Sequence, residues 1–376
     1  IALRIHRLTN ILKAGMKQLG FSADNIYYFD TLTFSLGKKC DSIYERALEE
    51  GINLRKTDSQ QLGISLDEET TKEDIVTLWR VFAGDKKLPS IDELDSHFMD
   101  LSNDSGIPKN LRRTSDILTH SVFHQYHSET AMLRYLRYLQ DKDIALDRAM
   151  IPLGSCTMKL NATSEMIPIS WSEFANIHPF APPQQTEGYR DLIGELEKAL
   201  IQITGFDAVS MQPNSGAQGE YAGLLTIRSY HKSRGEEQRN VCLIPSSAHG
   251  TNPASATLAS MKIIIVKCDQ DGNIDLENLR ILAEKQGKNL AALMITYPST
   301  HGVFEDSLIQ ICDIIHENGG QVYMDGANLN ALMGIAQPGK LGPDVLHINL
   351  HKTFCIPNGR GGPGMGPIGL KEHLAK

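Results

Sequence analysis

The sequence lacks the features that mark several specialised classes of protein. Its six cysteines are spread so widely that the two nearest, Cys242 and Cys268, are 26 positions apart, which excludes the C-x-x-C spacing of zinc and redox sites. His120, His124 and His127 have helical spacing but no accompanying carboxylate pattern, so no metal site is expected. No apolar run approaches the roughly 20 residues that cross a bilayer. Asp and Glu (45) outnumber Lys and Arg (37), so a nucleic-acid backbone is not the expected main partner.

The length and composition are those of a globular protein with more than one domain. At roughly 150 residues per domain, 376 residues predict two to three domains. Hydrophobic residues make up 41% of the chain and charged residues 22%, which suits a large buried core. A polar stretch over residues 100–108 predicts a boundary, so we expect a small α+β domain over 1–110 and a second domain over 111–376. Because an amphipathic helical run already starts at Ile1, we expect a fragment, and the cysteine usage favours a reducing compartment.

The second predicted domain alternates short apolar runs with helical stretches. The apolar runs predict buried strands, and the segments between them predict helices. The strands are expected at residues 208–211, 241–244, 263–266, 291–296, 321–324 and 345–350. Buried strands separated by helices are typical of an α/β domain with a mostly parallel sheet. Ligands of such sheets bind at the carboxyl ends of the strands.

One of these strand ends has the composition of an anion site. The string Q-P-N-S-G-A-Q over residues 212–218 comes where a strand turns into a helix, so the amides of Ser215, Gly216 and Ala217 are expected to point out of the helix start. Unpaired amides and the helix dipole favour an anion such as phosphate at that position. A tight Ser-Gly turn without a ligand is the alternative. The G-x-x-x-x-G-K-[ST] spacing of a nucleotide-binding P-loop is absent.

Two charged residues follow later strands of the same sheet. Asp325 comes directly after the strand at 321–324, and Lys352 follows the strand at 345–350. Alone, each has an ordinary explanation, as a turn aspartate and a solvated loop lysine. Together with the anion site they match pyridoxal 5′-phosphate (PLP), whose phosphate, ring nitrogen and aldehyde need an anion cup, a carboxylate and an amine. His249 also follows a strand, and it either stacks on the PLP ring or is an ordinary loop histidine.

Five strings of the sequence resemble one family of enzymes. They include the predicted phosphate, aspartate and lysine positions. The strings are I-P-L-G-S-C-T-M-K-L-N (151–161), Q-P-N-S-G-A-Q-G-E-Y-A-G (212–223), S-A-H-G-T-N-P-A-S-A (247–256), D-G-A-N (325–328) and N-L-H-K-T-F-C-I-P (349–357). They are similar to glycine decarboxylase, the P protein of the glycine cleavage system. The resemblance covers the chain from about residue 114 onward, and the first hundred residues resemble less distinctively the end of the family's cofactor-free half.

The resemblance implies a fold and a set of site residues. The fold is α/β, a fold-type-I PLP domain like that of aspartate aminotransferase, preceded by the small α+β domain and lacking the C-terminal small domain. Lys352 corresponds to the Schiff-base lysine, Asp325 to the partner of the ring nitrogen and His249 to the stacking residue. The other implied contacts are the phosphate cup of Ser215, Gly216 and Ala217, Thr353 beside it, and Thr157 and Lys159 at the substrate carboxylate. Lys159 is equally well explained as a solvated loop lysine.

The resemblance also implies an activity and partners. The family uses PLP to decarboxylate glycine oxidatively and transfers the aminomethyl group to the lipoyl arm of the H protein, as glycine dehydrogenase (aminomethyl-transferring). The full-length protein is expected to form a homodimer in the mitochondrial matrix or, from a bacterial source, in the cytoplasm, without a membrane span. The alternatives are another fold-type-I PLP aminotransferase or decarboxylase, and a non-catalytic fragment.

The glycine-rich stretch at 357–364 departs from the family. It reads P-N-G-R-G-G-P-G where the family usually has P-H-G-G-G-G-P-G, so Asn358 and Arg360 are the differences. The stretch also satisfies the G-x-G-x-x-G pattern of dinucleotide-binding proteins. Because Pro363 stands where a helix should open, NAD binding is not expected.

Overall fold

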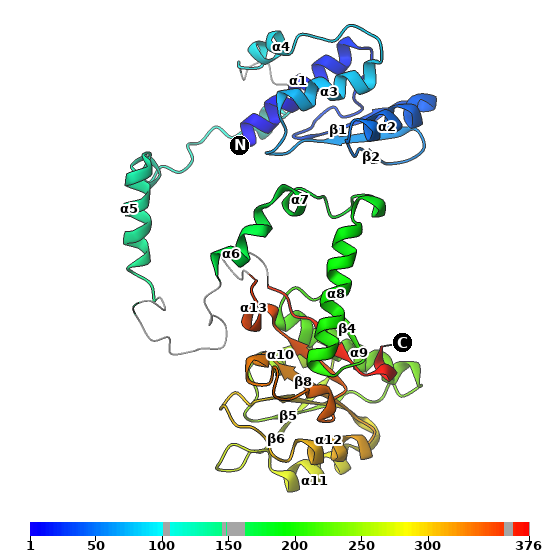
Figure 1. Ribbon diagram of the computed structural model, residues 1–376, viewed down its shortest axis with the longest axis vertical. Helices are drawn as coiled ribbons and strands as arrows, with labels where there is room; N and C mark the ends of the chain where they lie inside the picture. Colours follow the sequence, from blue (N-terminus) through cyan, green and yellow to red (C-terminus); the bar gives the residue numbers. More distant parts are fainter. Residues whose placement is uncertain (101–105, 145–147, 149–161, 357–363, 376) are drawn as a thin grey trace. The chain divides into compact units, whose positions relative to one another are not determined.

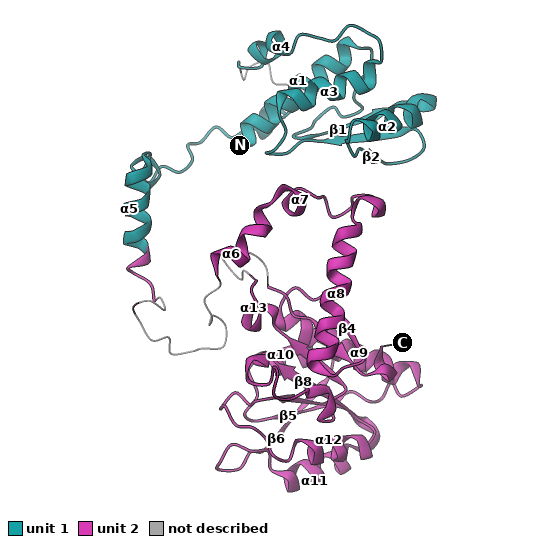
Figure 2. Cartoon of the chain, viewed as in Figure 1, with its two compact units in different colours: residues 1–139 teal, residues 140–376 magenta. Residues whose placement is uncertain are grey.

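The chain consists of two units in the computed structural model, which describes residues 1–100, 106–144, 148, 162–356 and 364–375. Unit 1 covers residues 1–139 and unit 2 covers residues 140–376 (Figure 2). The division falls near the end of helix α5 (Glu129–Gln140). The domain boundary that we expect after residue 110 stays a prediction.

Unit 1 contains a small antiparallel sheet with the strand order β1-β3-β2. Its elements are α1 (Ala2–Gln18), β1 (Thr31–Ser35), α2 (Cys40–Glu49), β2 (Arg55–Lys56), β3 (Gln61–Ser65), α3 (Lys72–Ala83) and α4 (Ile91–His97). Helix α3 begins with a capping box between Thr71 and Asp74. Its Trp79 is fully buried and donates from Nε1 to the Leu12 carbonyl at 3.3 Å. Unit 1 is therefore the small α+β fold that the sequence predicts.

A seven-stranded sheet forms the centre of unit 2 (Figure 1). Its strands are β4 (Ala208–Ser210), β5 (Val241–Pro245), β6 (Lys262–Val266), β7 (Leu290–Thr296), β8 (Gln321–Gly326), β9 (Val345–Ile348) and β10 (Ile368–Leu370). The strand order is β4-β10-β9-β8-β7-β5-β6, and only β10 runs antiparallel to its neighbours. The sequence predicts every strand except β10. That strand has three residues with a glycine in the middle, which is too short for a hydrophobic pattern.

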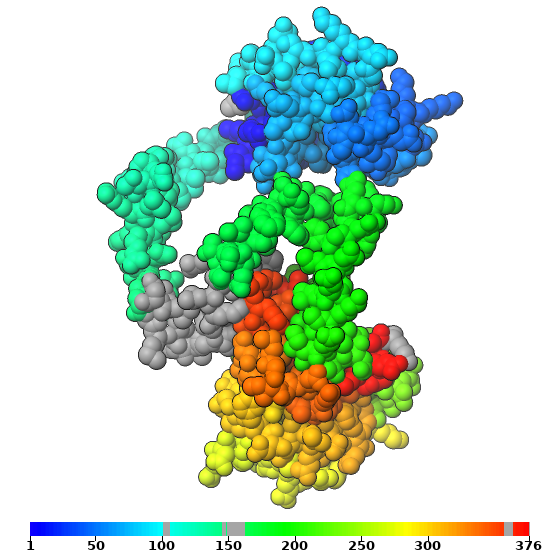
Figure 3. Space-filling model, viewed as in Figure 1, coloured from blue at the N-terminus to red at the C-terminus, as the bar shows by residue number. Residues whose placement is uncertain are grey.

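Helices cover both faces of this sheet. The helices of unit 2 are α6 (Thr163–Met166), α7 (Ser172–Ala175), α8 (Glu187–Thr204), α9 (Gly216–Ser233), α10 (Thr251–Leu258), α11 (Leu276–Gln286), α12 (Leu308–Glu317) and α13 (Leu350–Thr353). Neighbouring strand residues point to opposite faces, so Leu243 packs in the core with α8, α11 and α12, whereas Ile244 packs with α9 and α10. In Figure 3, green residues from early in unit 2 lie against orange and red residues from its end. No described helix combines the length and hydrophobicity that crossing a bilayer requires.

Helix α9 packs closely on the sheet at Gly223. A Cβ added at this glycine would lie 2.9 Å from Val345 Cγ1 and 2.9 Å from Tyr323 Cε2. We expect Gly223→Ala to lower the free energy of unfolding by about 1–3 kcal/mol, because overpacking outweighs the ~1 kcal/mol helix preference of alanine. Gly194→Ala in α8 is the matched control, since nothing lies within 4 Å of its added Cβ. Urea unfolding measures both, and a Gly223→Ala variant as stable as Gly194→Ala would contradict this packing.

A histidine–aspartate pair lies at the amino end of β9. Asp344 Oδ2 accepts the Val322 N–H at 2.7 Å and lies 2.7 Å from Nε2 of His316. The hydrogen bond to Asp344 raises the pKa of His316 above its ordinary value of 6.5. The stabilisation is therefore complete below pH 6.5 and is lost as the pH rises through the higher pKa of the folded state.

We expect His316→Gln to destabilise the protein more at pH 6 than at pH 8.5. The difference should be modest because the His316 side chain is 36% exposed and its ion pair is screened by solvent. Unfolding curves at the two pH values measure it, with the exposed His301→Gln as the control. Equal destabilisation at both pH values would show that the pair does not titrate with folding.

Candidate functional site

Asp325 is a buried carboxylate at the carboxyl end of β8. The residue is 4% exposed, its Oδ1 accepts the Ala327 N–H at 3.0 Å, and its Oδ2 accepts from Asn252 Nδ2 of α10 at 3.1 Å. The bond from Ala327 is that of an ordinary turn aspartate, but the bond from Asn252 comes from 73 positions away. A buried carboxylate needs such partners to remain charged. Asp325 is therefore held in one orientation by two elements.

Three further polar side chains surround Asp325 on the face of the sheet that α9 covers. His347 stands opposite Asp325 in the β8–β9 pairing, and its Nε2 lies 3.5 Å from Asp325 Oδ1. Burial, together with the charges of Asp325 and Glu220, raises the pKa of Tyr323 well above its ordinary value, so its hydroxyl remains protonated and bonds to His347 Nδ1. One carboxylate oxygen of Glu220, one of Asp325 and one ring nitrogen of His347 all lie within 4.8 Å of one another. We call these four residues the Asp325 cluster.

The start of helix α9 lies beside the connection that follows β9. Ser215 caps the helix, its Oγ accepting the Gln218 N–H at 3.2 Å. The amides of Gly216 and Ala217 belong to the first turn, where helical N–H groups have no acceptor within the helix. A Cβ added at Gly216 would lie 2.8 Å from Asn349 Oδ1, so this glycine permits a close approach to the segment that carries Lys352.

Lys352 lies in α13, directly after β9. Its backbone N–H bonds to the Asn349 carbonyl at 3.1 Å, and its own carbonyl accepts from Asn330 Nδ2 at 3.1 Å. Asn330 belongs to the segment after β8, the strand whose carboxyl end carries Asp325. Asp325, at the end of β8, and Lys352, directly after β9, therefore belong to neighbouring parallel strands whose following connections are hydrogen-bonded to each other.

The residues around the start of α9 fit a ligand with an anionic group. Thr353 is 9% exposed, and its hydroxyl makes no hydrogen bond to any residue that the structure describes. Buried hydroxyl groups almost always have a partner, so this oxygen suits a ligand atom. The amides of Gly216 and Ala217, the Thr353 hydroxyl, the Lys352 amine and the Asp325 carboxylate are together the chemical groups that the parts of PLP require.

His249 lies on the exposed connection between β5 and α10. Its Nδ1 lies 2.8 Å from Thr251 Oγ1, and that hydroxyl donates to Glu220 Oε1 at 2.7 Å. His249 is thus connected to the Asp325 cluster by two hydrogen bonds. Two other predicted site residues, Thr157 and Lys159, fall outside the described residues. So do the family departures at 358 and 360.

The sequence did not predict Glu220, Asn252 or His347 as site residues. Glu220 comes four positions after Gly216, so both lie on the same side of α9, and an acid on the sheet-facing side of a helix was the available signal. His347 had a weaker signal, a histidine inside an apolar strand. Asn252 had none beyond its place in the string over residues 247–256.

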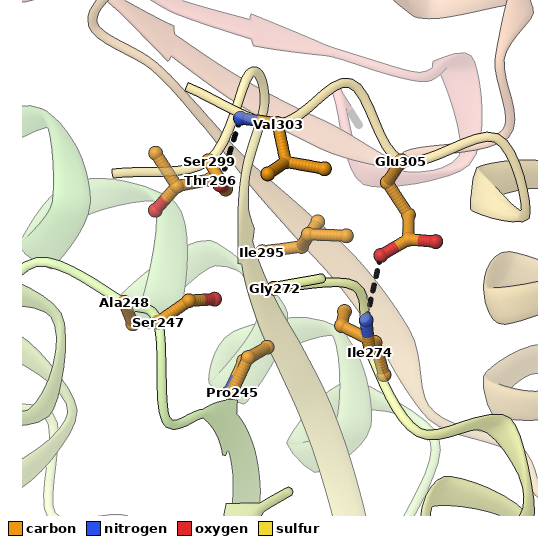
Figure 4. A pocket seen from close by; sticks show the side chains of 10 residues that line it. All are labelled: Pro245, Ser247, Ala248, Gly272, Ile274, Ile295, Thr296, Ser299, Val303 and Glu305. Carbon is orange, nitrogen blue, oxygen red and sulfur yellow. Dashed lines mark hydrogen bonds between the residues drawn. The ribbon is translucent and has the colours of Figure 1, made fainter. Parts of the chain in front are cut away.

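A small cavity lies at the carboxyl ends of β5 and β7 (Figure 4). Pro245, Ser299 and Glu305 are among its lining residues, and Glu305 Oε2 accepts the Ile274 N–H at 2.7 Å. Its volume of about 10 Å³ holds at most one water molecule. This cavity is too small for an aromatic cofactor, so it is not the candidate site.

Solved structures share the fold of this chain. A crystal structure of glycine decarboxylase (P-protein) of the glycine cleavage system, in inhibitor-bound form, matches 83% of this chain and 64% of its own with a TM-score of 0.55 and 19% identity. A structure of Oryza sativa TDC with PLP and tryptamine matches 76% of this chain and 66% of its own with a TM-score of 0.50 and 12% identity. The predicted fold class is confirmed: unit 2 has the α/β fold of fold-type-I PLP enzymes.

Sequence comparison identifies the family. Glycine dehydrogenase (decarboxylating) from Cupriavidus metallidurans is 59% identical over 375 residues, and that from Paraburkholderia xenovorans is 58% identical over 379 residues. Both matches cover all of this chain but only 38% and 39% of the relatives. Both relatives are bacterial, which gives the expected mitochondrial location no support. The family model "Glycine cleavage system P-protein" matches residues 1–82 and 91–376. The chain belongs to the glycine cleavage system P-protein family.

Proposed function

We propose that this chain carries the PLP-binding part of a glycine decarboxylase. The activity would be oxidative decarboxylation of glycine, with transfer of the aminomethyl group to the lipoyl arm of the H protein. The observation that carries this proposal is the buried, doubly hydrogen-bonded Asp325, whose strand pairs in parallel with the strand before Lys352. The proposed partners are glycine, the lipoylated H protein and, for the full-length protein, a second copy in a homodimer.

The chain's own residues supply binding and charge. When bound, PLP supplies an aldehyde that bonds to amines and a ring that accepts the electron pair released with carbon dioxide. The first turn of α9 and the Thr353 hydroxyl would hold the phosphate. The Asp325 carboxylate would hold a proton on the ring nitrogen, and the Lys352 amine would hold the aldehyde. His249 would cover one face of the ring.

The net reaction transfers one electron pair and one carbon unit. Glycine loses its carboxyl group as carbon dioxide, and the remaining aminomethyl carbon forms a bond to one lipoyl sulfur. The S–S bond of the lipoyl group breaks, and the second sulfur takes up a proton and stays on the lipoyl arm as a thiol. Glycine is thereby oxidised and the disulfide reduced.

Exchange of labelled bicarbonate into the carboxyl group of glycine tests the proposal. We expect the chain, loaded with PLP and mixed with lipoylated H protein, to catalyse this exchange. An aminotransferase does not break the bond to the carboxyl carbon, so PLP-dependent amino transfer without exchange would favour that alternative. A PLP titration that shows no binding would favour the non-catalytic fragment.

A further inference from the structure

A short hydrogen-bonded chain runs from Glu220 on α9 to His249 on the loop before α10. Thr251 stands between them, with its Oγ1 2.7 Å from Glu220 Oε1 and 2.8 Å from His249 Nδ1. The backbone N–H of Thr251 also points at His249 Nδ1, from 3.2 Å. Glu220 is only 3% exposed, whereas His249 is exposed. The hydrogen bonds therefore connect a buried carboxylate to an exposed imidazole ring.

The position of the single hydrogen of the Thr251 hydroxyl determines which groups donate and which accept in these hydrogen bonds. A carboxylate accepts and cannot donate, so the hydroxyl hydrogen points to Glu220. The oxygen then presents only lone pairs to His249, and a 2.8 Å contact requires the hydrogen of that bond on Nδ1. The backbone N–H of Thr251 favours the opposite tautomer, with Nδ1 as acceptor, but its contact is the longer one.

We propose that Glu220 is a positioning residue that sets the tautomer of His249 through the Thr251 hydroxyl. With Nδ1 carrying the hydrogen, the lone pair of the exposed imidazole is on Nε2. Under the proposed function, this leaves the stacking residue with a free acceptor at the cofactor face. That consequence rests on the proposed function, whereas the tautomer itself does not.

Glu220 also lies close to the other residues of the Asp325 cluster. Its Oε2 is buried and makes no hydrogen bond to a described residue, and one of its carboxylate oxygens lies within 4.8 Å of a polar side-chain atom of both Asp325 and His347. Asp325, His347 and Tyr323 are the titratable groups that face it from the sheet, and His249 is the one it reaches through the loop. One carboxylate therefore lies near Asp325 and is linked to His249 through the Thr251 hydroxyl.

Nitrogen-15 NMR of histidine-labelled chain tests the proposal without cofactor. Spectra are recorded at about pH 8.5, two units above the ordinary histidine pKa, and show which ring nitrogen carries the hydrogen. The His249 signals are assigned by their loss in His249→Gln. We expect the hydrogen on Nδ1 in the unmodified chain. Thr251→Val should move it to Nε2, because the hydroxyl is gone and only the backbone N–H remains beside Nδ1.

Three further variants complete the test. Glu220→Met should also move the hydrogen to Nε2, because the released hydroxyl then donates to Nδ1. Thr251→Ser keeps the hydroxyl and should keep the hydrogen on Nδ1. Thr257→Val removes a hydroxyl from the same helix, one that bonds only to the Pro253 carbonyl among the contacts shown, and should change nothing.

The outcomes separate this inference from the proposed function. A hydrogen on Nε2 in the unmodified chain, or one that stays on Nδ1 in Thr251→Val, overturns the inference. Should Glu220→Met fail to fold, the comparison of Thr251→Val with Thr251→Ser still decides whether the hydroxyl sets the tautomer. A chain that shows the expected tautomers but binds no PLP would retain the inference and overturn the proposed function.

Discussion

Lys352→Ala should abolish the covalent attachment of PLP and lower bicarbonate–glycine exchange by at least about 10³-fold, the scale lost when a covalent catalytic group is removed. Alanine has no amine to bond to the aldehyde, and no other described lysine comes directly after a strand that pairs with β8, the strand that carries Asp325. The measurement is the cofactor absorbance that borohydride bleaches and fixes to the protein. The fold should survive, because the contacts shown for Lys352 are made by its backbone.

The control for this loss is Lys340→Ala, which removes an exposed lysine from the connection between β8 and β9. It should bind PLP and support exchange as the unmodified chain does. Circular dichroism of Lys352→Ala shows whether the variant is folded, and so whether the loss of PLP attachment is due to the missing amine or to unfolding. If borohydride still fixed PLP to the folded Lys352→Ala protein, another lysine would be the attachment point and the assignment would fail.

The strands of unit 2 were predictable because burial on both faces leaves continuous apolar runs. Strand β7 is buried along almost its whole length, and its sequence shows this directly. In unit 1, the apolar stretch at residues 26–36 has a strand pattern but forms a strand only over β1, and Ile26 and Tyr27 before it are 77% and 63% exposed. An apolar residue next to a true strand looks the same in sequence whether or not the strand includes it. The sequence did not predict strand β10, because its three residues have no strand pattern of their own and are extended through their pairing with β4 and β9.

The site was predictable only where each residue follows a strand. Asp325, Lys352 and Ser215 stand at strand ends or helix starts, so their places come from local sequence and the rule that parallel strands end together. The partners of Asp325 come from other elements. Asn252 is 73 positions away, and His347 is opposite Asp325 only because β9 pairs with β8 in this register. A local sequence pattern does not reveal strand order or register, so the Asp325 cluster could be identified only from the structure.

Asp325→Asn should slow bicarbonate–glycine exchange by about 10- to 150-fold while leaving the stability nearly unchanged. A hydrogen bond to a charged group is worth about 1.5–3 kcal/mol, which corresponds to that range of rates. The amide has the shape of the carboxylate but not its charge, so it would no longer hold a proton on the ring nitrogen when electrons enter the ring. Removing one of two nearby buried carboxylates also relieves repulsion with Glu220, which offsets the loss of hydrogen bonds.

The matched control is Asp313→Asn on the exposed side of α12, which should change neither exchange nor stability. Exchange rates and urea unfolding are measured on both variants, together with PLP binding. Bound PLP with an altered absorption spectrum and slow exchange is the pattern expected of a lost ring-nitrogen partner. Full exchange activity in Asp325→Asn would mean that the buried carboxylate supports only the fold, and the single observation on which the proposed function depends would no longer favour PLP chemistry.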